Sequence, residues 1–184
     1  MTVFFGIAII AVAIVFYAIN LYNVLVQQRM VVREASADIE TLLKKRFDLV
    51  PNLVNTVKGY AKHEEGVFTK VTELRTQMQE ASGDMAKLSE INNQMTQTLK
   101  SLFAVAENYP NLKADASFLQ LQAQLADLET EIQKSRRFYN ATVGDYNTKL
   151  QVFPNVLFVG IFKFTPAEFF AAADEEKQNV KVEF

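Results

Sequence analysis

The single histidine is the side chain in this sequence that most readily suggests chemistry. His63 is followed by Glu64 and Glu65 in a segment with helical periodicity. A histidine on a helical bundle suggests phosphotransfer, but no acidic receiver domain accompanies it here. A histidine near the middle of an exposed helix is usually only solvated. We therefore keep phosphotransfer through His63 as an alternative function.

Other patterns that carry chemistry are missing from the sequence. With no cysteine, disulfides, thiolate zinc sites and a cysteine nucleophile are all excluded. With one histidine and no Glu-x-x-His pair, a metal site would have to be all-carboxylate. Neither a glycine-rich phosphate loop nor a G-x-S-x-G turn occurs. We expect no enzyme activity, no cofactor, and no catalytic, cofactor-binding or metal-binding residues.

The start of the chain, residues 1–26, has no charged side chain. Its apolar run from Val3 to Ile19 is broken only by Gly6 and Tyr17. About 20 helical residues cross a hydrocarbon layer of ~30 Å, and in lipid the backbone must satisfy its own hydrogen bonds. A cleavable signal peptide would begin with basic residues, which are absent. The pattern predicts an uncleaved transmembrane anchor over residues 1–26.

The charges beside the anchor predict its orientation. No lysine or arginine precedes it, whereas Arg29, Arg33, Lys44 and Lys45 follow within about 20 residues. Basic residues near a span stay in the cytoplasm. We therefore expect the N-terminus outside and the rest of the chain in the cytoplasm.

The remaining chain of roughly 155 residues has the size of one domain. All 19 basic and 21 acidic residues lie in it, and the net charge of −2 gives no basic surface for nucleic acid. With 6 glycines and 4 prolines, the chain has little material for turns. This composition is typical of a few long helices.

Apolar residues recur every three or four positions from Val32 to Phe47, which continues a helix out of the anchor. Asp48 and Pro51 then resemble a new start, with Asp48 as the N-cap and Pro51 in the first turn. We expect the chain to reverse there. The alternative is one kinked helix that continues through Pro51.

Three further helices follow from the same periodicity. The second ends at Gly83, which suits a left-handed position, and Asp84 can cap the third. The third stops before Tyr109-Pro110, and the fourth runs from Asp115 over nearly 35 residues. No segment alternates with a period of two. The predicted fold is all-α: an N-terminal transmembrane helix followed by an antiparallel four-helix bundle over residues 27–153.

A phenylalanine-rich tail, residues 154–184, follows Pro154. Its first apolar run, of about nine residues, is too short to cross a membrane as a helix. The tail either folds as a lid over the bundle or touches the membrane surface. If the chain has four antiparallel legs, the tail returns to the anchor, and we expect membrane contact; if the helix continues through Pro51, three legs remain and the tail points into the cytoplasm. The residues expected to touch the membrane are Phe158, Phe162, Phe164, Phe169 and Phe170.

Polar residues at regular spacing are expected to hold the bundle together. Lys44-Lys45-Arg46 lies about 27 Å beyond the anchor, outside the ~8 Å reach of lipid charge. Arg46 is therefore expected to pair with Asp48 or Glu107. Two Tyr-Asn pairs, Tyr139-Asn140 and Tyr146-Asn147, are seven residues apart and so share one helix face. We expect them to fix the helix register beside Tyr22-Asn23, with a contact between subunits as the alternative.

The motifs in this sequence resemble those of the LemA family from the anchor to about residue 155. The resemblance is carried by Tyr22-Asn23, by residues 46–54 (RFDLVPNLV) with Asn52 among them, by residues 107–113 (ENYPNLK), by Arg136-Arg137-Phe138-Tyr139-Asn140, by Tyr146-Asn147 and by Phe153-Pro154. Phe47 stands where the family often has tyrosine. The resemblance weakens beyond that point, although residues 180–184 are similar to the family's closing Val-x-Phe ending.

This resemblance implies a bacterial membrane protein with one N-terminal span and a four-helix bundle. The family includes the magnetosome protein MamQ, which is linked to shaping an internal membrane, and no catalytic residue can be transferred from it. We expect a non-enzymatic scaffold in the bacterial inner membrane that contacts lipid, self-associates as a homo-oligomer, and organises or remodels the membrane. The alternative is an adaptor that recruits an envelope-stress factor or protease; no nucleic-acid partner is expected.

Overall fold

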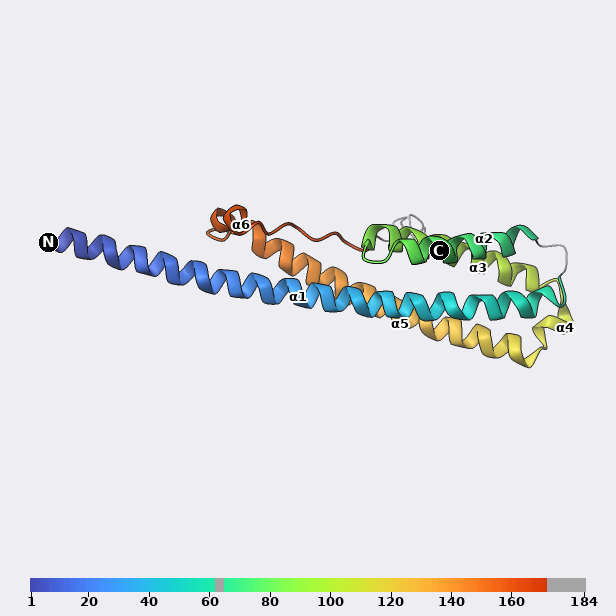
Figure 1. Cartoon of the computed structure of the whole chain (residues 1–184). Coiled ribbons are helices and arrows are strands. Elements are labelled where there is room, and N and C mark those ends of the chain that lie inside the picture. Colours follow the sequence, from blue (N-terminus) through green and yellow to red (C-terminus); the bar gives the residue numbers. More distant parts are fainter. Residues whose placement is uncertain (62–64, 172–184) are drawn as a thin grey trace, which may run out of the picture.

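The computed structural model describes residues 1–61 and 65–171. Within these residues every regular element is a helix (Figure 1). The prediction of an all-α protein with a long apolar N-terminal helix is confirmed. The helices are α1 (Thr2–Lys58), α2 (Glu65–Glu80), α3 (Met85–Ala106), α4 (Pro110–Lys113), α5 (Ala116–Gln151) and α6 (Val156–Phe162).

The long helices form two antiparallel hairpins of unequal length. Helices α1 and α5 lie side by side over most of the length of α5, and the shorter α2–α3 hairpin packs against them at the end far from the N-terminus (Figure 1). These four helices alternate in direction along the chain (Figure 1). However, α2 and α3 cover only the far part of the α1–α5 pair. The part nearer the anchor is covered by the tail.

The predicted chain reversal at Asp48 and Pro51 is wrong, because α1 continues through Pro51. A proline inside a helix removes one hydrogen bond and costs about 3 kcal/mol. Phe47, Val50 and Leu53, on both sides of it, are buried. Burying each such side chain contributes about 1.5–3 kcal/mol, so packing outweighs the lost hydrogen bond.

The chain reverses instead after Lys58, about two helical turns later. Gly59 is the C-cap of α1, and the amides of Tyr60 and Ala61 both donate to the carbonyl of Val57. Because the turn comes after Lys58, the chain still forms four long helices, α1, α2, α3 and α5, although α1 is unbroken. The expectation that a continuous helix leaves only three legs was also wrong, because it placed the only available turn at Pro51.

The predicted left-handed turn at Gly83 and the predicted cap at Asp84 are confirmed, and Asp115 caps α5 in the same way. Gly83 has a positive φ of 84° between α2 and α3. Asp84 accepts a hydrogen bond from the Lys87 amide, and Asp115 accepts from the amides of Ser117 and Phe118. These carboxylates satisfy amides that a helix leaves unpaired at its start.

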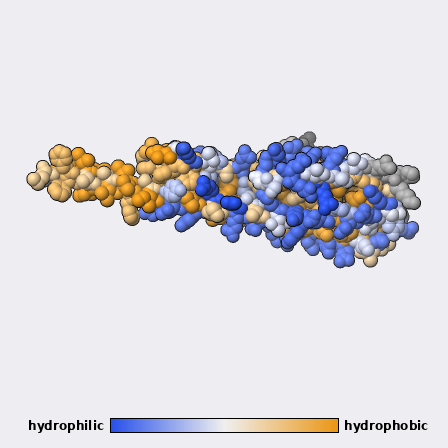
Figure 2. Space-filling model, viewed as in Figure 1, coloured by the Kyte–Doolittle hydropathy of each residue, from blue (hydrophilic) through white to orange (hydrophobic). Residues whose placement is uncertain are grey.

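The N-terminal part of the anchor, before the contacts at Tyr17, extends beyond the rest of the molecule as an apolar rod (Figure 2). Helix α1 is long and apolar enough to cross a membrane, and none of its most apolar 18-residue window is buried. A core helix would be buried on one face at least. This exposed apolar helix indicates membrane anchoring.

Candidate functional site

Four side chains of α5 hold the tail along the surface of that helix. We call the tail residues 164–171 the strap; they follow α6 and form no helix. The Asn147 side chain accepts a hydrogen bond from the Ala167 amide at 2.8 Å and donates to the Ala167 carbonyl at 2.9 Å. Asn140 makes the same pair of bonds with Phe170, at 2.9 and 3.0 Å. Each asparagine therefore satisfies both backbone groups of one strap residue.

The adjacent tyrosines bind the strap backbone as well. The Tyr146 hydroxyl donates to the Thr165 carbonyl at 3.1 Å, and the Tyr139 hydroxyl donates to the Glu168 carbonyl at 2.8 Å. Burial raises the pKa of both phenols, so they stay protonated and keep donating at neutral pH. At its far end, the strap is held by the Ser89 hydroxyl of α3, which donates to the Ala171 carbonyl.

The spacing of these contacts follows from the geometry of helix and extended chain. Seven helical residues rise about 10.5 Å, and three extended residues span about 10 Å. The two asparagines are seven residues apart, and their strap partners, Ala167 and Phe170, are three apart. The strap thus runs antiparallel to α5 with one heptad matched to three strap residues.

Two phenylalanines fix the strap into the core. Phe164 and Phe170 are 6% and 1% exposed, so the prediction that they touch the membrane is wrong. Each ring also lies beneath an arginine, Phe164 under Arg29 at 5.2 Å and Phe170 under Arg136 at 5.3 Å. The burial and the cation–π contact both favour a strap packed on protein.

Helix α6 lies beside α1 at the level where the anchor ends. The Tyr17 hydroxyl donates to the Asn155 side-chain oxygen at 2.6 Å, just before α6. The rings of Phe158 and Phe162 contact those of Tyr17 and Tyr22, with centroids 5.8 and 5.3 Å apart. The expected return of the tail to the foot of the anchor is therefore observed.

The outward face of α6 is apolar. Val156, Leu157 and Ile161 are 48%, 60% and 72% exposed, and no residue of α6 is fully buried. Phe158 and Phe162 are half-buried against α1, so they lie behind this face. Phe169 is exposed, but it lies on the strap beside Phe170. Phe158 and Phe162 were expected to touch the membrane, but the side chains that α6 exposes are Val156, Leu157 and Ile161.

The Tyr-Asn pairs bind a different partner from the one predicted. Asn140 and Asn147 bind the strap, whereas Asn23 is exposed on α1. Tyr22 contacts Phe162 and Phe164, so it supports the tail through its ring. The heptad spacing of the Tyr-Asn pairs correctly indicated one shared face, but it could not show that the partner is backbone from the end of the chain.

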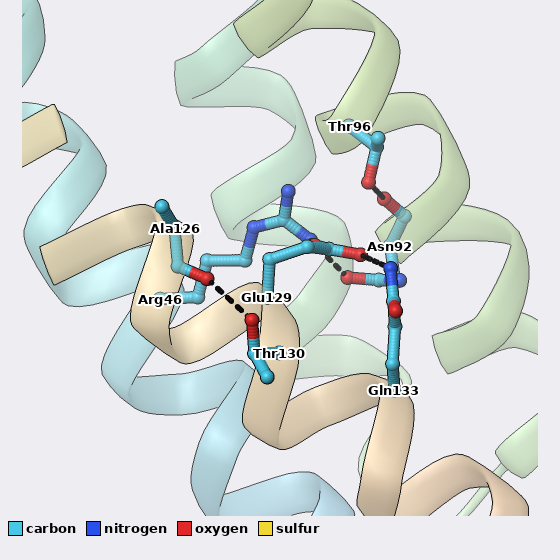
Figure 3. Close-up of polar contacts among 7 residues, drawn as sticks. All are labelled: Arg46, Asn92, Thr96, Ala126, Glu129, Thr130 and Gln133. Carbon is cyan, nitrogen blue, oxygen red and sulfur yellow. Dashed lines mark hydrogen bonds and ion pairs between the residues drawn. The ribbon is translucent and has the colours of Figure 1, made fainter. Parts of the chain in front are cut away.

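A second polar cluster lies in the centre of the bundle, where α1, α3 and α5 meet (Figure 3). One terminal nitrogen of Arg46 lies 2.8 Å from a carboxylate oxygen of Glu129 and donates to the Asn92 side-chain oxygen, also at 2.8 Å. Gln133 donates to the other oxygen of Glu129. Burial lowers the pKa of Arg46, and the charge of Glu129 opposes that change. The cluster joins three helices at one level.

The predicted partners of Arg46 are wrong. Asp48 lies 3.7 Å from Arg75 of α2, and Glu107 is exposed at the end of α3. Asp48 points elsewhere because α1 does not break at Pro51, so two residues along the helix place it on another face. Asn52 is likewise exposed on α1, and its carbonyl accepts from Thr56 within the helix.

The candidate for phosphotransfer, His63, and its neighbour Glu64 lie outside the described residues. Among the residues described, no group of three or more His, Asp or Glu side chains could hold a metal ion. The described residues instead position the tail. The Tyr-Asn pairs of α5 bind the strap, and the strap holds an apolar helix, α6, beside the anchor.

Comparisons with known proteins agree with the sequence motifs. A model of the LemA family matches residues 35–184. Protein LemA of Metamycoplasma hominis is 26% identical over 131 residues, which cover 71% of this chain and 60% of that protein. Magnetosome protein MamQ 2 of Paramagnetospirillum magneticum is 24% identical, and magnetosome protein MamQ of Magnetospirillum gryphiswaldense is 22% identical; in each case the match covers 81% of this chain and 64% of the relative. The matches thus span less than two thirds of the length of these relatives.

Proposed function

Because this chain belongs to the LemA family, we propose that it is a membrane-anchored, non-enzymatic scaffold that self-associates and organises or remodels the membrane on which it lies. The proposal places the N-terminus outside and the bundle in the cytoplasm, at a bacterial inner membrane. One observation carries it: the apolar outward face of α6 lies beside the last turns of the anchor.

The level of α6 follows from the length of the span. A helix that enters the hydrocarbon near Val3 leaves it about 20 residues later, close to Tyr22. The contacts from Asn155 to Tyr17 and from Phe162 to Tyr22 place α6 along this last stretch. Tyrosines are enriched at this boundary because their rings prefer lipid and their hydroxyls prefer water. Helix α6 then lies within the edge of one leaflet.

A short apolar helix at this depth acts as a wedge. At seven residues it is about 10 Å long, so it occupies space in one leaflet without crossing the membrane. Space filled in one leaflet alone favours curvature. The strap holds this wedge on a rigid bundle, which prevents it from tilting freely. Many copies in one membrane add their effects, since clustering in two dimensions raises the local concentration of each.

Reconstitution in liposomes tests the proposal. The wild-type protein is expected to form oligomers and to change vesicle shape as the protein-to-lipid ratio rises. Leu157→Glu puts a charge on the wedge and is expected to abolish the shape change. Phe169→Glu is the matched control: its side chain is similarly exposed, but it lies beside Phe170, which binds Asn140 about 16 Å along α5 from the end of that helix at Gln151.

Two results would contradict the scaffold. The first is a protein that stays monomeric in detergent and in liposomes and does not alter vesicle shape. A single stoichiometric partner protein recovered from native membranes, with no self-association, would instead support the adaptor. Phosphate labelling that is lost in His63→Ala would support phosphotransfer.

A further inference from the structure

One long face of the α1–α5 pair is left uncovered by the other residues that the structure describes. Two neighbouring open grooves of about 490 Å³ each run along this seam, and both are lined by Lys45 and Glu131. All residues that line them belong to α1 and α5, with none from α2, α3 or the strap. We call this surface the outer face.

The outer face has an apolar floor at heptad spacing. Leu42 of α1 lines one groove, and Leu49 of α1 and Leu128 of α5 line the other; all three are half-buried, and Leu42 and Leu49 are seven residues apart. Phe138 is 57% exposed at the end of one groove. The fully buried residues of α5, by contrast, lie on its inner face. Leu128 and Phe138 thus lie on the groove side of α5, apart from its fully buried residues.

The rim of the outer face carries charges of alternating sign. Asp38 and Lys45 of α1 line the same groove as Glu131 and Lys134 of α5. All four are exposed, and in the part of the chain that the structure describes none of them makes an ion pair within 4.0 Å. Along this groove each helix therefore presents one acidic and one basic side chain that has no ion pair among the described residues. In the neighbouring groove α5 adds a second exposed acid, Asp127, which lines it together with Lys45 and Glu131.

We infer that the outer face is the surface through which two copies of this chain associate, with α1 of each copy packed against α5 of the other. This inference deepens the proposed function, on which it rests, since the anchors make all copies parallel in one membrane. A two-fold axis along the membrane normal then brings residues of equal height together. Lys45 faces Glu131 of the second copy, and Asp38 faces Lys134 of the second copy. Each attractive pair occurs twice.

Other arrangements of the same faces are less favourable. Packing α1 against α1 would oppose Lys45 to Lys45 and Asp38 to Asp38 of the second copy, and like charges at an interface are repulsive. An antiparallel pair would place the two anchors at opposite ends, which one membrane cannot accommodate. The charge pattern thus selects the α1-to-α5 arrangement of a second copy of this chain.

Charge reversal tests the inference. In liposomes, energy transfer between labelled copies measures the dissociation constant of the dimer. Lys45→Glu and Glu131→Lys are each expected to weaken the dimer about tenfold, because a pair present twice changes from attraction to repulsion. The double variant, Lys45→Glu with Glu131→Lys, is expected to restore association. Lys44→Glu is the control, since Lys44 lies next to Lys45 but lines a groove between α1 and α2.

Disulfide formation between single-cysteine variants gives an independent test, made simple by a chain without cysteine. When Leu49→Cys and Leu128→Cys proteins are mixed in one membrane, the cross-linked species is expected to contain one copy of each. Equal weakening by Lys44→Glu and Lys45→Glu, or cross-links confined to identical copies, would overturn the inference but leave self-association intact. A wild-type protein without energy transfer at any density would contradict the proposed function itself.

Discussion

The amide of Asn140 meets both backbone groups of Phe170, 30 residues further along the chain: it donates to the Phe170 carbonyl at 3.0 Å and accepts from the Phe170 amide at 2.9 Å. Both partners are at least partly buried, so water does not readily replace these bonds. The same geometry at Asn147 and Ala167 makes the strap a part of the bundle. The position of α6 depends on these contacts.

Replacing one donor should therefore release the strap. Asn140→Asp keeps the acceptor for the Phe170 amide but sets a carboxylate oxygen against the Phe170 carbonyl. We expect a loss of about 1–3 kcal/mol in the local stability of the strap, the cost of an unsatisfied buried polar group. Hydrogen exchange at the Phe170 amide measures this directly. Asn52→Asp, on an exposed part of α1, is expected to leave the exchange unchanged; equal protection in Asn140→Asp would show that the strap is held by its phenylalanines alone.

The ion pair of Arg46 and Glu129 should respond unequally to loss of either partner. The Arg46 side chain is 4% exposed and that of Glu129 is 28% exposed. Glu129→Leu leaves a buried positive charge and is expected to cost about 3–5 kcal/mol of unfolding free energy. Arg46→Met leaves a carboxylate whose side chain is 28% exposed, although the oxygen that faced Arg46 is itself buried, and it also removes the buried Nε of Arg46, which has no hydrogen-bond partner among the described residues; we expect a smaller loss.

A double-mutant cycle by chemical denaturation checks this asymmetry. The variant with both Arg46→Met and Glu129→Leu should be more stable than Glu129→Leu alone, because no unpaired charge remains. If Arg46→Met proves the more damaging single change, the account of burial at this cluster is incorrect.

The continuity of α1 gives a prediction at Pro51. Alanine supplies the amide that proline lacks, so Pro51→Ala should restore the helical hydrogen bond and raise the free energy of unfolding by about 2 kcal/mol. Pro166→Ala, on the exposed part of the strap, changes the unfolded chain in the same way without a helical bond to gain. A chain that used Pro51 at the start of a helix would lose stability on this substitution.

The cap of α5 should make stability depend on pH below neutrality. The amide of Phe118, with smaller contributions from Tyr60 and Ser117, holds the pKa of Asp115 below its ordinary value of 3.8. A carboxyl whose pKa is lower in the folded chain stabilises it at higher pH, and this contribution is lost as the pH falls through the folded pKa. The melting temperature of the wild type should therefore exceed that of Asp115→Asn at pH 6, and the difference should shrink below about pH 4.

Asp145→Asn is the control for that measurement, since Asp145 is exposed in the interior of α5, away from the cap. A difference between wild type and Asp115→Asn that stays constant from pH 6 to pH 3 would mean that the carboxylate charge contributes nothing at the cap.

Periodicity and capping were enough to predict most of the fold. The cap at Asp84 was predictable because it is local: its carboxylate bonds an amide three residues away. Asp115, which was predicted only as the start of the fourth helix, bonds amides two and three residues away in the same manner. The turn at Pro51 was predicted wrongly because local propensity there opposes the burial of Phe47 and Val50, which depends on partners distant in sequence. Gly59 was the missed signal for the true turn, since glycine is common just after helices.

The candidate site was only partly predictable, for a similar reason. The heptad spacing of Asn140 and Asn147 showed that they share a face. Their partners are backbone groups, which every residue has, so the sequence does not show which residues they bind. Phe164 and Phe170 resembled the exposed apolar residues of α6 because composition does not separate a buried ring from a membrane-facing one. The buried strap rings differ from the exposed residues of α6 because three strap residues align with one heptad of α5. This alignment can be read only from the three-dimensional structure.

The depth of α6 in the membrane tests the central claim most directly. The chain has no tryptophan, so Leu157→Trp and, as its control, Phe169→Trp each provide a single fluorescent reporter in liposomes containing brominated lipids. The account predicts strong quenching of the residue 157 reporter by bromines near the headgroups, and none for residue 169. Equal, weak quenching at both positions would show that α6 stays in water, and would contradict the proposal that this tail acts on the membrane.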